Sequence, residues 1–275
     1  MLYNNFKSMK VEIKQQVAWV TIDHPPINLM DAQLRSEFNA LVPALAEDQR
    51  INVIVFQSAN PDFFIAHGDL TTIGPTKSDL GISPNQALRE RLRTMPKVTI
   101  AKLEGRARGG GAETALSMDM RFAARGRAIL SQPEVMLGLV PPGTSTQRLP
   151  RLMGRSRALE VLLGCEDFDA DLAERYGYVN RALDAHEIGP FVARLANRIA
   201  SFPPETLAYT KAATLAAERN VLEGLQEEFR LFNKNVVQGE FARRRDIYLQ
   251  SGGQTKEAEL DLAAWAERLA GARSE

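Results

Sequence analysis

A glycine-rich segment between a predicted strand and a predicted helix constrains this chain more than any other feature. Residues 97–103 are rich in branched side chains, which predicts a strand, and residues 112–118 predict a helix. Between them, residues 105–111 end in three consecutive glycines. A helix that starts there leaves backbone N–H groups unpaired, and glycine lets a ligand approach them closely. The segment therefore predicts a backbone site for an anionic oxygen.

A carboxylate accompanies these glycines. Glu113 follows Gly110 by three residues, so the two lie on the same face of the first helical turn. One short segment thus offers an oxyanion donor beside a carboxylate. Taken alone, the segment slightly favours a tight strand-to-helix turn whose exposed glutamate stabilises the helix end.

The order of the other predicted elements indicates an α/β fold. Residues 17–22 and 51–57 predict strands, and the intervening helix has Asp31 as its N-cap and a kink at Pro43. A second helix is predicted to begin at Ser83 with a capping box and a proline in its first turn. From residue 201 the pattern becomes helical only, which places a boundary near residue 200. The predicted C-terminal helices carry an apolar stripe of Leu222, Leu225, Phe229, Phe232 and Val236.

Composition excludes several classes of protein. Lys plus Arg and Asp plus Glu are 34 each in 275 residues, so no net positive field favours nucleic acid or an anionic membrane as partner. No apolar run reaches membrane-spanning length, and residues 1–14 lack the apolar core of a secretory signal. Cys165 cannot form an internal disulfide. We expect a soluble, cytoplasmic protein.

Several well-known motifs fail on inspection. Thr114 occupies the third glycine position of a dinucleotide-binding loop, and Gln147 replaces the closing glycine of a nucleophile elbow, which predicts that Ser145 is a loop serine. The histidines have no metal-ligand spacing, so no metal is expected. Most arginines of the clusters are expected in solvent or in ion pairs, and contact of one cluster with a ligand phosphate is the alternative. These clusters comprise Arg121, Arg125 and Arg127, then Arg148, Arg151, Arg155 and Arg157, and residues 243–245.

Four segments together resemble the crotonase superfamily of enoyl-coenzyme A hydratases and isomerases. Residues 64–70, with the sequence FIAHGDL, resemble the first oxyanion loop of the family, and residues 109–113 resemble the second. Residues 131–138 and 146–149 follow in the order that the family shows. The resemblance extends over nearly the whole chain. It implies an α/β spiral of repeated strand-strand-helix turns in residues 1–200, with a helical region in residues 201–275 that assembles trimers, commonly paired into hexamers.

The resemblance also implies roles for individual residues. Gly68 and Gly110 would donate their amides to the thioester oxygen of an acyl-coenzyme A, and Glu113 and Glu134 would be the catalytic carboxylates. Retention of both carboxylates favours hydration of a trans-2-enoyl-coenzyme A over a double-bond shift. No cofactor is implied beyond the coenzyme A of the substrate. The positions expected to contact substrate or coenzyme A are Ala66, His67, Gly68, Asp69, Leu70, Gly110 and Pro142.

Two positions depart from the family pattern. His67 stands where the family usually has glycine, and we expect it to serve structure or coenzyme contact. Pro142 stands where a glycine N–H lies near the catalytic water in hydratases, and proline has no N–H. Another enolate reaction therefore stays open, namely a double-bond shift, carbon-carbon cleavage or decarboxylation. A non-catalytic protein that binds acyl-coenzyme A or RNA is the alternative of a different class.

Overall fold

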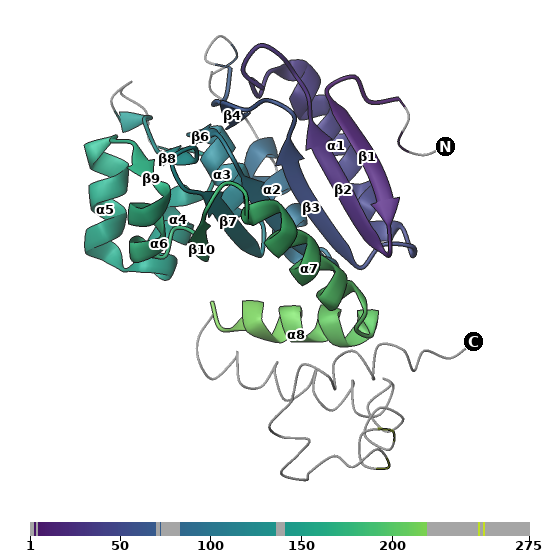
Figure 1. The fold of residues 1–275 in the computed structure, drawn as a ribbon. Helices are drawn as coiled ribbons and strands as arrows, with labels where there is room; N and C mark the ends of the chain where they lie inside the picture. Colours follow the sequence, from purple (N-terminus) through teal and green to yellow (C-terminus); the bar gives the residue numbers. More distant parts are fainter. Residues whose placement is uncertain are drawn as a thin grey trace.

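Two β-sheets and the helices that cover them make up the described part of the chain (Figure 1). The computed structural model describes residues 3, 5–69, 72, 83–135, 141–218, 247 and 250. The larger sheet has the strand order β1-β2-β3-β5-β7-β10, and all its neighbours are parallel except β1 and β2. Its strands are β1 (Met9–Lys14), β2 (Val17–Ile22), β3 (Val53–Ser58), β5 (Val98–Leu103), β7 (Met120–Ala124) and β10 (Arg181–Leu183).

The smaller sheet has the order β4-β6-β8-β9, with β9 antiparallel to β8. Its strands are β4 (Phe63–Ile65), β6 (Arg106–Arg108), β8 (Ile129–Ser131) and β9 (Phe168–Asp169). The eight helices of the described residues are α1 (Ala32–Glu47), α2 (Pro84–Thr94), α3 (Gly110–Leu116), α4 (Ser145–Met153), α5 (Arg155–Gly164), α6 (Ala170–Tyr176), α7 (Ile188–Ala200) and α8 (Pro204–Ala216).

The chain repeats one unit along this framework. Each turn places one strand in the larger sheet and the next in the smaller sheet before a helix follows, as in β3-β4-α2, β5-β6-α3 and β7-β8-α4. This confirms the predicted α/β spiral of strand-strand-helix turns. Because the β4, β6 and β8 strands run parallel, the loops that follow them meet at one edge of the smaller sheet.

Local capping signals were predicted correctly. Asp31 accepts a hydrogen bond from Leu34 N at 2.9 Å, and α1 continues through Pro43 to Glu47. Ser83 and Gln86 form the expected capping box of α2. The strand predicted at residues 51–57 begins instead at Val53, because Asn52 hydrogen-bonds the turn at Gln16 and the end of α7.

The inner strands β3 and β5 of the larger sheet are buried on both faces, whereas the edge strand β1 exposes alternate residues. On β3, Val53 and Val55 pack toward α7, whereas Ile54 and Phe56 point to the core on the opposite face. Helix α7 lies across the sheet (Figure 1) and contributes a stripe of Ile188, Val192, Ala196 and Ala200. Each fully buried valine or isoleucine of these elements stabilises the fold by roughly 1.5–3 kcal/mol.

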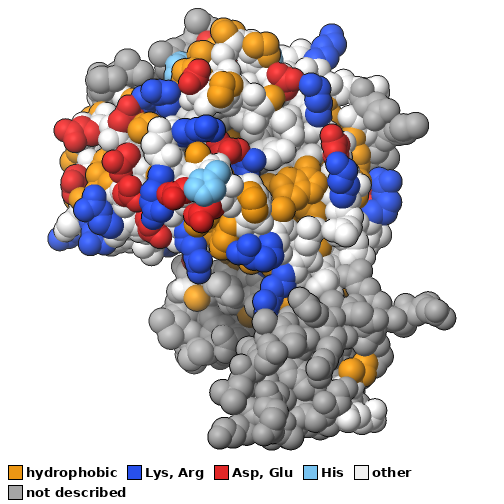
Figure 2. Space-filling model, viewed as in Figure 1, with side chains coloured by type: hydrophobic (Ala, Val, Ile, Leu, Met, Phe, Trp, Pro, Cys, Tyr) orange, Lys and Arg blue, Asp and Glu red, His pale blue; other side chains and the backbone are white. Residues whose placement is uncertain are grey.

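Charged side chains of both signs are mixed over the face seen in Figure 2. The exposed guanidinium of Arg125 pairs with Asp171 and Asp184, as expected for the arginine clusters. Arg121 differs from that expectation because it is buried and donates to the carbonyl oxygens of Met118 and Tyr178. Exposed ion pairs contribute little to stability, so the fold rests mainly on its apolar core.

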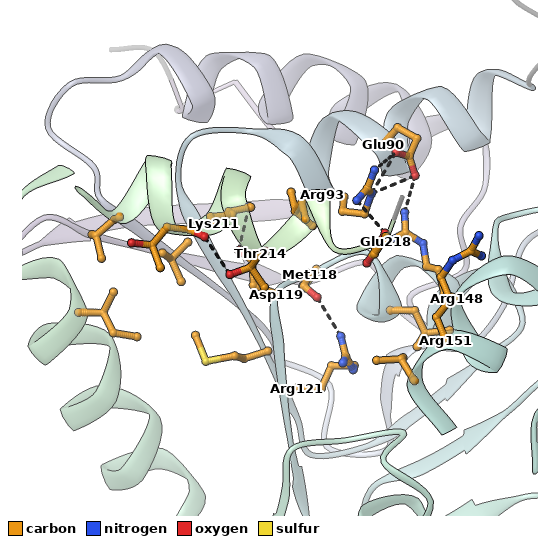
Figure 3. Close-up of a pocket in the computed structure, with 18 of the residues that line it drawn as sticks. Glu90, Arg93, Met118, Asp119, Arg121, Arg148, Arg151, Lys211, Thr214 and Glu218 are labelled. Carbon is orange, nitrogen blue, oxygen red and sulfur yellow. Dashed lines mark hydrogen bonds and ion pairs between the residues drawn. The ribbon is translucent and has the colours of Figure 1, made fainter. Parts of the chain in front are cut away.

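Helix α8 docks on the spiral through a buried lysine (Figure 3). Lys211 Nζ donates to Asp119 Oδ2 at 2.9 Å and to the carbonyl oxygen of Lys97 at 2.8 Å. The backbone and hydroxyl of Thr99 donate to the same carboxylate. The predicted boundary near residue 200 falls between α7 and α8, and the predicted apolar stripe at residues 222–236 lies outside the described residues.

Replacing Lys211 with methionine is expected to destabilise the protein by about 2 kcal/mol, because it leaves the Asp119 carboxylate and a carbonyl oxygen without their cationic donor. Urea unfolding followed by circular dichroism measures the change. Lys10→Met is the matched control, since Lys10 forms its ion pair with Asp23 in solvent. Equal unfolding midpoints for the two variants would show that the buried pair does not fasten α8.

Candidate active site

The two predicted oxyanion loops meet because β4 and β6 pair in parallel. Phe63 lies opposite Arg106 and Ile65 opposite Ala107, so both loops leave the same end of the smaller sheet. A hydrogen bond from Arg108 N to the carbonyl oxygen of Ala66 continues this pairing at 3.2 Å. A methyl group added at Gly110 would lie 3.4 Å from Gly68 N. The sheet therefore brings the two predicted amide donors together.

Gly68 is held in place by the backbone hydrogen bonds that its neighbours His67 and Asp69 make with Met30. The N–H of Gly68 takes no part in these bonds. Met30 N donates to the carbonyl oxygen of His67 at 2.9 Å, and Asp69 N donates to the carbonyl oxygen of Met30 at 3.2 Å. A methyl group added at Gly68 would meet no protein atom within 4 Å. The fold itself thus does not require glycine at this position, which is the arrangement expected where a ligand approaches the backbone.

The second loop turns sharply into α3. Gly109 has a φ of +46°, a region that favours glycine, and the helix begins at Gly110 rather than at the predicted residue 112. A methyl group added at Gly111 would lie 2.1 Å from the carbonyl oxygen of Ile65, so α3 packs directly on β4. The first N–H groups of α3 have no partner within the helix. Gly110 therefore presents its amide beside Gly68.

Glu113 is fixed by the N-terminus of α4. Its side chain is buried, and its Oε1 accepts hydrogen bonds from Gly143 N at 2.7 Å, Ser145 Oγ at 3.1 Å and Ser145 N at 3.4 Å. The prediction that Ser145 is a loop serine was wrong, because it is the buried first residue of α4. These donors hold the carboxyl group in one orientation.

Glu134 lies beside Glu113 in a different environment. It is 8% exposed, and no group of the described residues hydrogen-bonds its Oε2. A methyl group added at Gly109 would lie 2.7 Å from its Oε1, which places this carboxyl over the glycine loop. Burial, followed by the charge of Glu113, raises the pKa of Glu134 to about 7. The two predicted carboxylates therefore differ in their hydrogen-bond partners.

Arg89 is a site residue that the sequence did not reveal. It is 7% exposed, its Nη2 donates to the carbonyl oxygen of Gly110 at 2.9 Å, and Nη2 lies 3.6 Å from Glu113 Oε2. The one local indication that Arg89 is buried is its spacing of three residues from Leu92, which places both on the same face of α2; these are the two buried side chains of that helix.

The other predicted contact positions surround the glycine loops. Ala66 is buried, Asp69 is half-buried, and His67 Nδ1 donates to the carbonyl oxygen of Gly68 at 2.8 Å. Pro142 is exposed next to Gly143. Leu70 lies outside the described residues. None of these arrangements by itself assigns a ligand contact.

Within the described ranges, no three or more His, Cys, Asp and Glu side chains gather as a metal site would require. Across the helices described, none combines the length and apolar character needed to span a bilayer.

A cavity of about 1120 Å³ lies between α2, α4 and α8 (Figure 3). Its apolar walls include Leu116, Met118 and Leu207, and ion pairs of Glu90 with Arg93 and Arg148 line one side. Thr144 lines this cavity and immediately precedes Ser145, whose hydroxyl donates to Glu113. The cavity is therefore one residue along the chain from a contact of the carboxylate pair. Neither Glu113 nor Glu134 lines it.

Known proteins resemble this chain along most of its length. The family model described as enoyl-CoA hydratase/isomerase matches residues 12–253. The short-chain-enoyl-CoA hydratase of Clostridium acetobutylicum is 31% identical over 208 residues, which are 74% of this chain and 79% of that protein. A Dictyostelium discoideum protein named "Probable enoyl-CoA hydratase, mitochondrial" is 31% identical over 84% of each chain. The crystal structure of a candidate enoyl-CoA hydratase from Streptomyces avermitilis has a TM-score of 0.73, 38% identity and complete coverage of both chains.

Proposed function

Because the chain belongs to the enoyl-CoA hydratase/isomerase family, we propose that it catalyses the reversible syn-addition of water to a trans-2-enoyl-CoA, giving a 3-hydroxyacyl-CoA. One observation carries this choice within the family. Two buried carboxyl groups, Glu113 and Glu134, lie beside the paired glycine loops, and only one of them is held by several hydrogen-bond donors. Hydration requires both a proton acceptor and a proton donor.

The glycine loops would activate the thioester. The amides of Gly68 and Gly110 would donate to its carbonyl oxygen, which becomes negative as the enolate forms. Because both amides are fixed by the backbone before substrate arrives, they need no reorganisation during the reaction. Removing one such donor in other enzymes costs roughly 3–4 kcal/mol of transition-state stabilisation.

The carboxyl groups would handle the protons. Glu113 accepts a proton from water while the water oxygen bonds to C3 of the enoyl group, and Glu134 donates its proton to C2. The pair thus starts and ends with one proton in total, on Glu134 before the addition and on Glu113 after it. The coenzyme A moiety belongs to the substrate, and no further cofactor enters this scheme.

Activity is tested with enoyl-CoA thioesters of several chain lengths, followed by loss of the absorbance of the conjugated thioester. Turnover of at least one of them is expected. Absence of turnover across the series would remove hydration as the function.

The pH dependence of kcat/KM for hydration is a second prediction. The raised pKa of Glu134, about 7, means that the carboxyl group carries its proton below pH 7 and loses it above. We expect kcat/KM to fall as pH rises through about 7. The reverse dehydration uses the same number of protons, so its kcat/KM should fall in parallel. A profile that is flat from pH 6 to 8 would contradict the assignment of Glu134 as proton donor.

A double-bond shift in the same site is the second candidate. Pro142 has no N–H, and the neighbouring Gly143 N–H is already committed to Glu113 at 2.7 Å, so neither is free to hold a water. Mass spectrometry of the products separates the two reactions. An added water supports hydration, whereas an unchanged mass supports isomerisation.

We further propose a homotrimer, or a dimer of trimers, in the cytoplasm. The support is family membership for assembly and the balanced charge for a freely dissolved protein. Light scattering coupled to size-exclusion chromatography measures the assembly. A monomer at micromolar concentration would contradict the trimer, and fractionation of cells tests the location.

A further inference from the structure

Arg89 brings a permanent positive charge into the interior of the site. Its side chain is 8% exposed, and the guanidinium lies between the carbonyl oxygen of Gly110 and the Glu113 carboxylate. A methyl group added at Gly143 would lie 2.4 Å from its Nη1 and 2.0 Å from Glu113 Oε2. The guanidinium, the carboxylate and the α4 N-terminus are therefore packed against one another.

Charge balance decides how this cluster is ionised. An arginine stays protonated in proteins, and a buried cation without a partner is strongly destabilising. Ionising both Glu113 and Glu134 would leave a net negative charge in the buried cluster, whereas ionising one balances Arg89. Glu113 is the nearer carboxylate and receives three hydrogen bonds on Oε1. Glu134 Oε2 receives none from the described residues.

The other charged and titratable neighbours do not change this balance. The charge of Arg35 on α1 lowers the pKa of Arg89, but Arg35 is only half-buried and its Nη2 donates to the carbonyl oxygen of Met30 and the hydroxyl of Thr72, outside the cluster. Burial raises the pKa of Tyr178, so its hydroxyl stays neutral near pH 7. The Tyr178 hydroxyl accepts a hydrogen bond from Gln132. Arg89 itself attracts both carboxylates, which lowers the pKa of Glu134 relative to a site without the cation.

We propose that Arg89 is a positioning residue that keeps Glu113 ionised and so makes Glu113 the proton acceptor and Glu134 the proton donor. This rests on the proposed function and deepens it, because it explains how two adjacent carboxyl groups are held in opposite protonation states.

The test compares Arg89→Gln with Arg89→Lys over a pH series. Loss of the cation removes its attraction for the Glu134 carboxylate, so the fall of kcat/KM with rising pH should move to higher pH, by about one unit or more. At its new optimum pH, kcat should fall at least about tenfold, because the single proton of the pair is then no longer confined to Glu134. KM for a neutral enoyl-CoA should change little. Arg89→Lys should return the profile toward its original position.

Arg93→Gln is the matched control, because Arg93 is on the same helix and pairs with Glu90 and Glu218 away from the carboxylates. Its pH profile should be unchanged. If Arg89→Gln lowered the rate at every pH but kept the original pH optimum, the role of Arg89 would be structural only. A loss confined to carboxylated enoyl-CoA substrates would make Arg89 a substrate ligand instead.

A titration without substrate separates this inference from the proposed reaction. Carbon-13 NMR of glutamate-labelled protein follows the carboxyl groups of the wild type and of Arg89→Gln, with Glu134→Gln used to assign the signal. The Glu134 titration should move upward when Arg89 is removed. An unmoved titration would overturn the inference even if hydratase activity is present, whereas a shift without hydratase activity would overturn only the proposed function.

Discussion

Glu134→Gln is expected to lower turnover of enoyl-CoA by about 10²- to 10⁴-fold, the usual range for loss of a general acid. Glutamine keeps the shape of the side chain but cannot donate a proton to C2 of the substrate. Steady-state hydration of a short enoyl-CoA measures the loss. Binding of coenzyme A thioester should persist, because the amides of Gly68 and Gly110 are unaltered. Unchanged turnover would remove Glu134 from the mechanism.

Glu113→Gln is the companion variant, with a similar expected loss of turnover and a different effect on stability. Neutral glutamine suits the site of Glu134, whose buried carboxyl group already favours its protonated form. At position 113 it leaves the buried Arg89 without its nearest carboxylate. Thermal unfolding should therefore show a lower Tm for Glu113→Gln and an equal or higher Tm for Glu134→Gln. The opposite order would contradict the charge assignment.

Gly143→Ala is expected to reduce turnover by roughly 100-fold, which is the cost of misplacing a catalytic group by about 1 Å. The added methyl group would lie 2.0 Å from Glu113 Oε2 and 2.4 Å from Arg89 Nη1, so both side chains must move. The Gly143 N–H that orients Glu113 would shift with them. Assays of kcat/KM beside circular dichroism distinguish this local displacement from unfolding.

Gly189→Ala is the matched control for that substitution. A methyl group at Gly189 meets no atom within 4 Å, and the residue lies in α7 far along the chain from the carboxylates. Its turnover should equal that of the wild type. If Gly143→Ala also retained full activity, the tight packing of Glu113 against α4 would have no part in catalysis.

Features specified by neighbouring residues were predictable from the sequence. The Asp31 cap, the Ser83 capping box and the strand at Val17–Ile22 each depend on contacts or patterns within a few residues. The glycine run was also informative, because a turn with φ of +46° at Gly109 favours glycine whatever surrounds it. The start of α3 was misplaced by two residues, since helix ends depend on packing such as that of Gly111 on Ile65.

Features that depend on distant pairing were not predictable in the same way. Arg89 reaches Gly110 across 21 residues, and Ser145 reaches Glu113 across 32. No local pattern distinguishes these side chains from the solvated arginines and loop serines elsewhere in the chain. Resemblance to the family supplied the carboxylates and glycines, whereas the buried cation between them emerged only from the packing of α2 against α3.

Because β4 pairs in parallel with β6, the positions of the backbone amides and the identity of the carboxyl side chains can change independently on substitution. The spacing of the Gly68 and Gly110 amides depends on main-chain hydrogen bonds and on strand register, which side-chain changes leave in place. The proposed proton-handling groups are side chains attached to α3 and to the loop after β8. Mutation could therefore exchange or delete a carboxyl group and still leave the proposed thioester activation intact. On such a scaffold, a single substitution would be enough to change the proton chemistry.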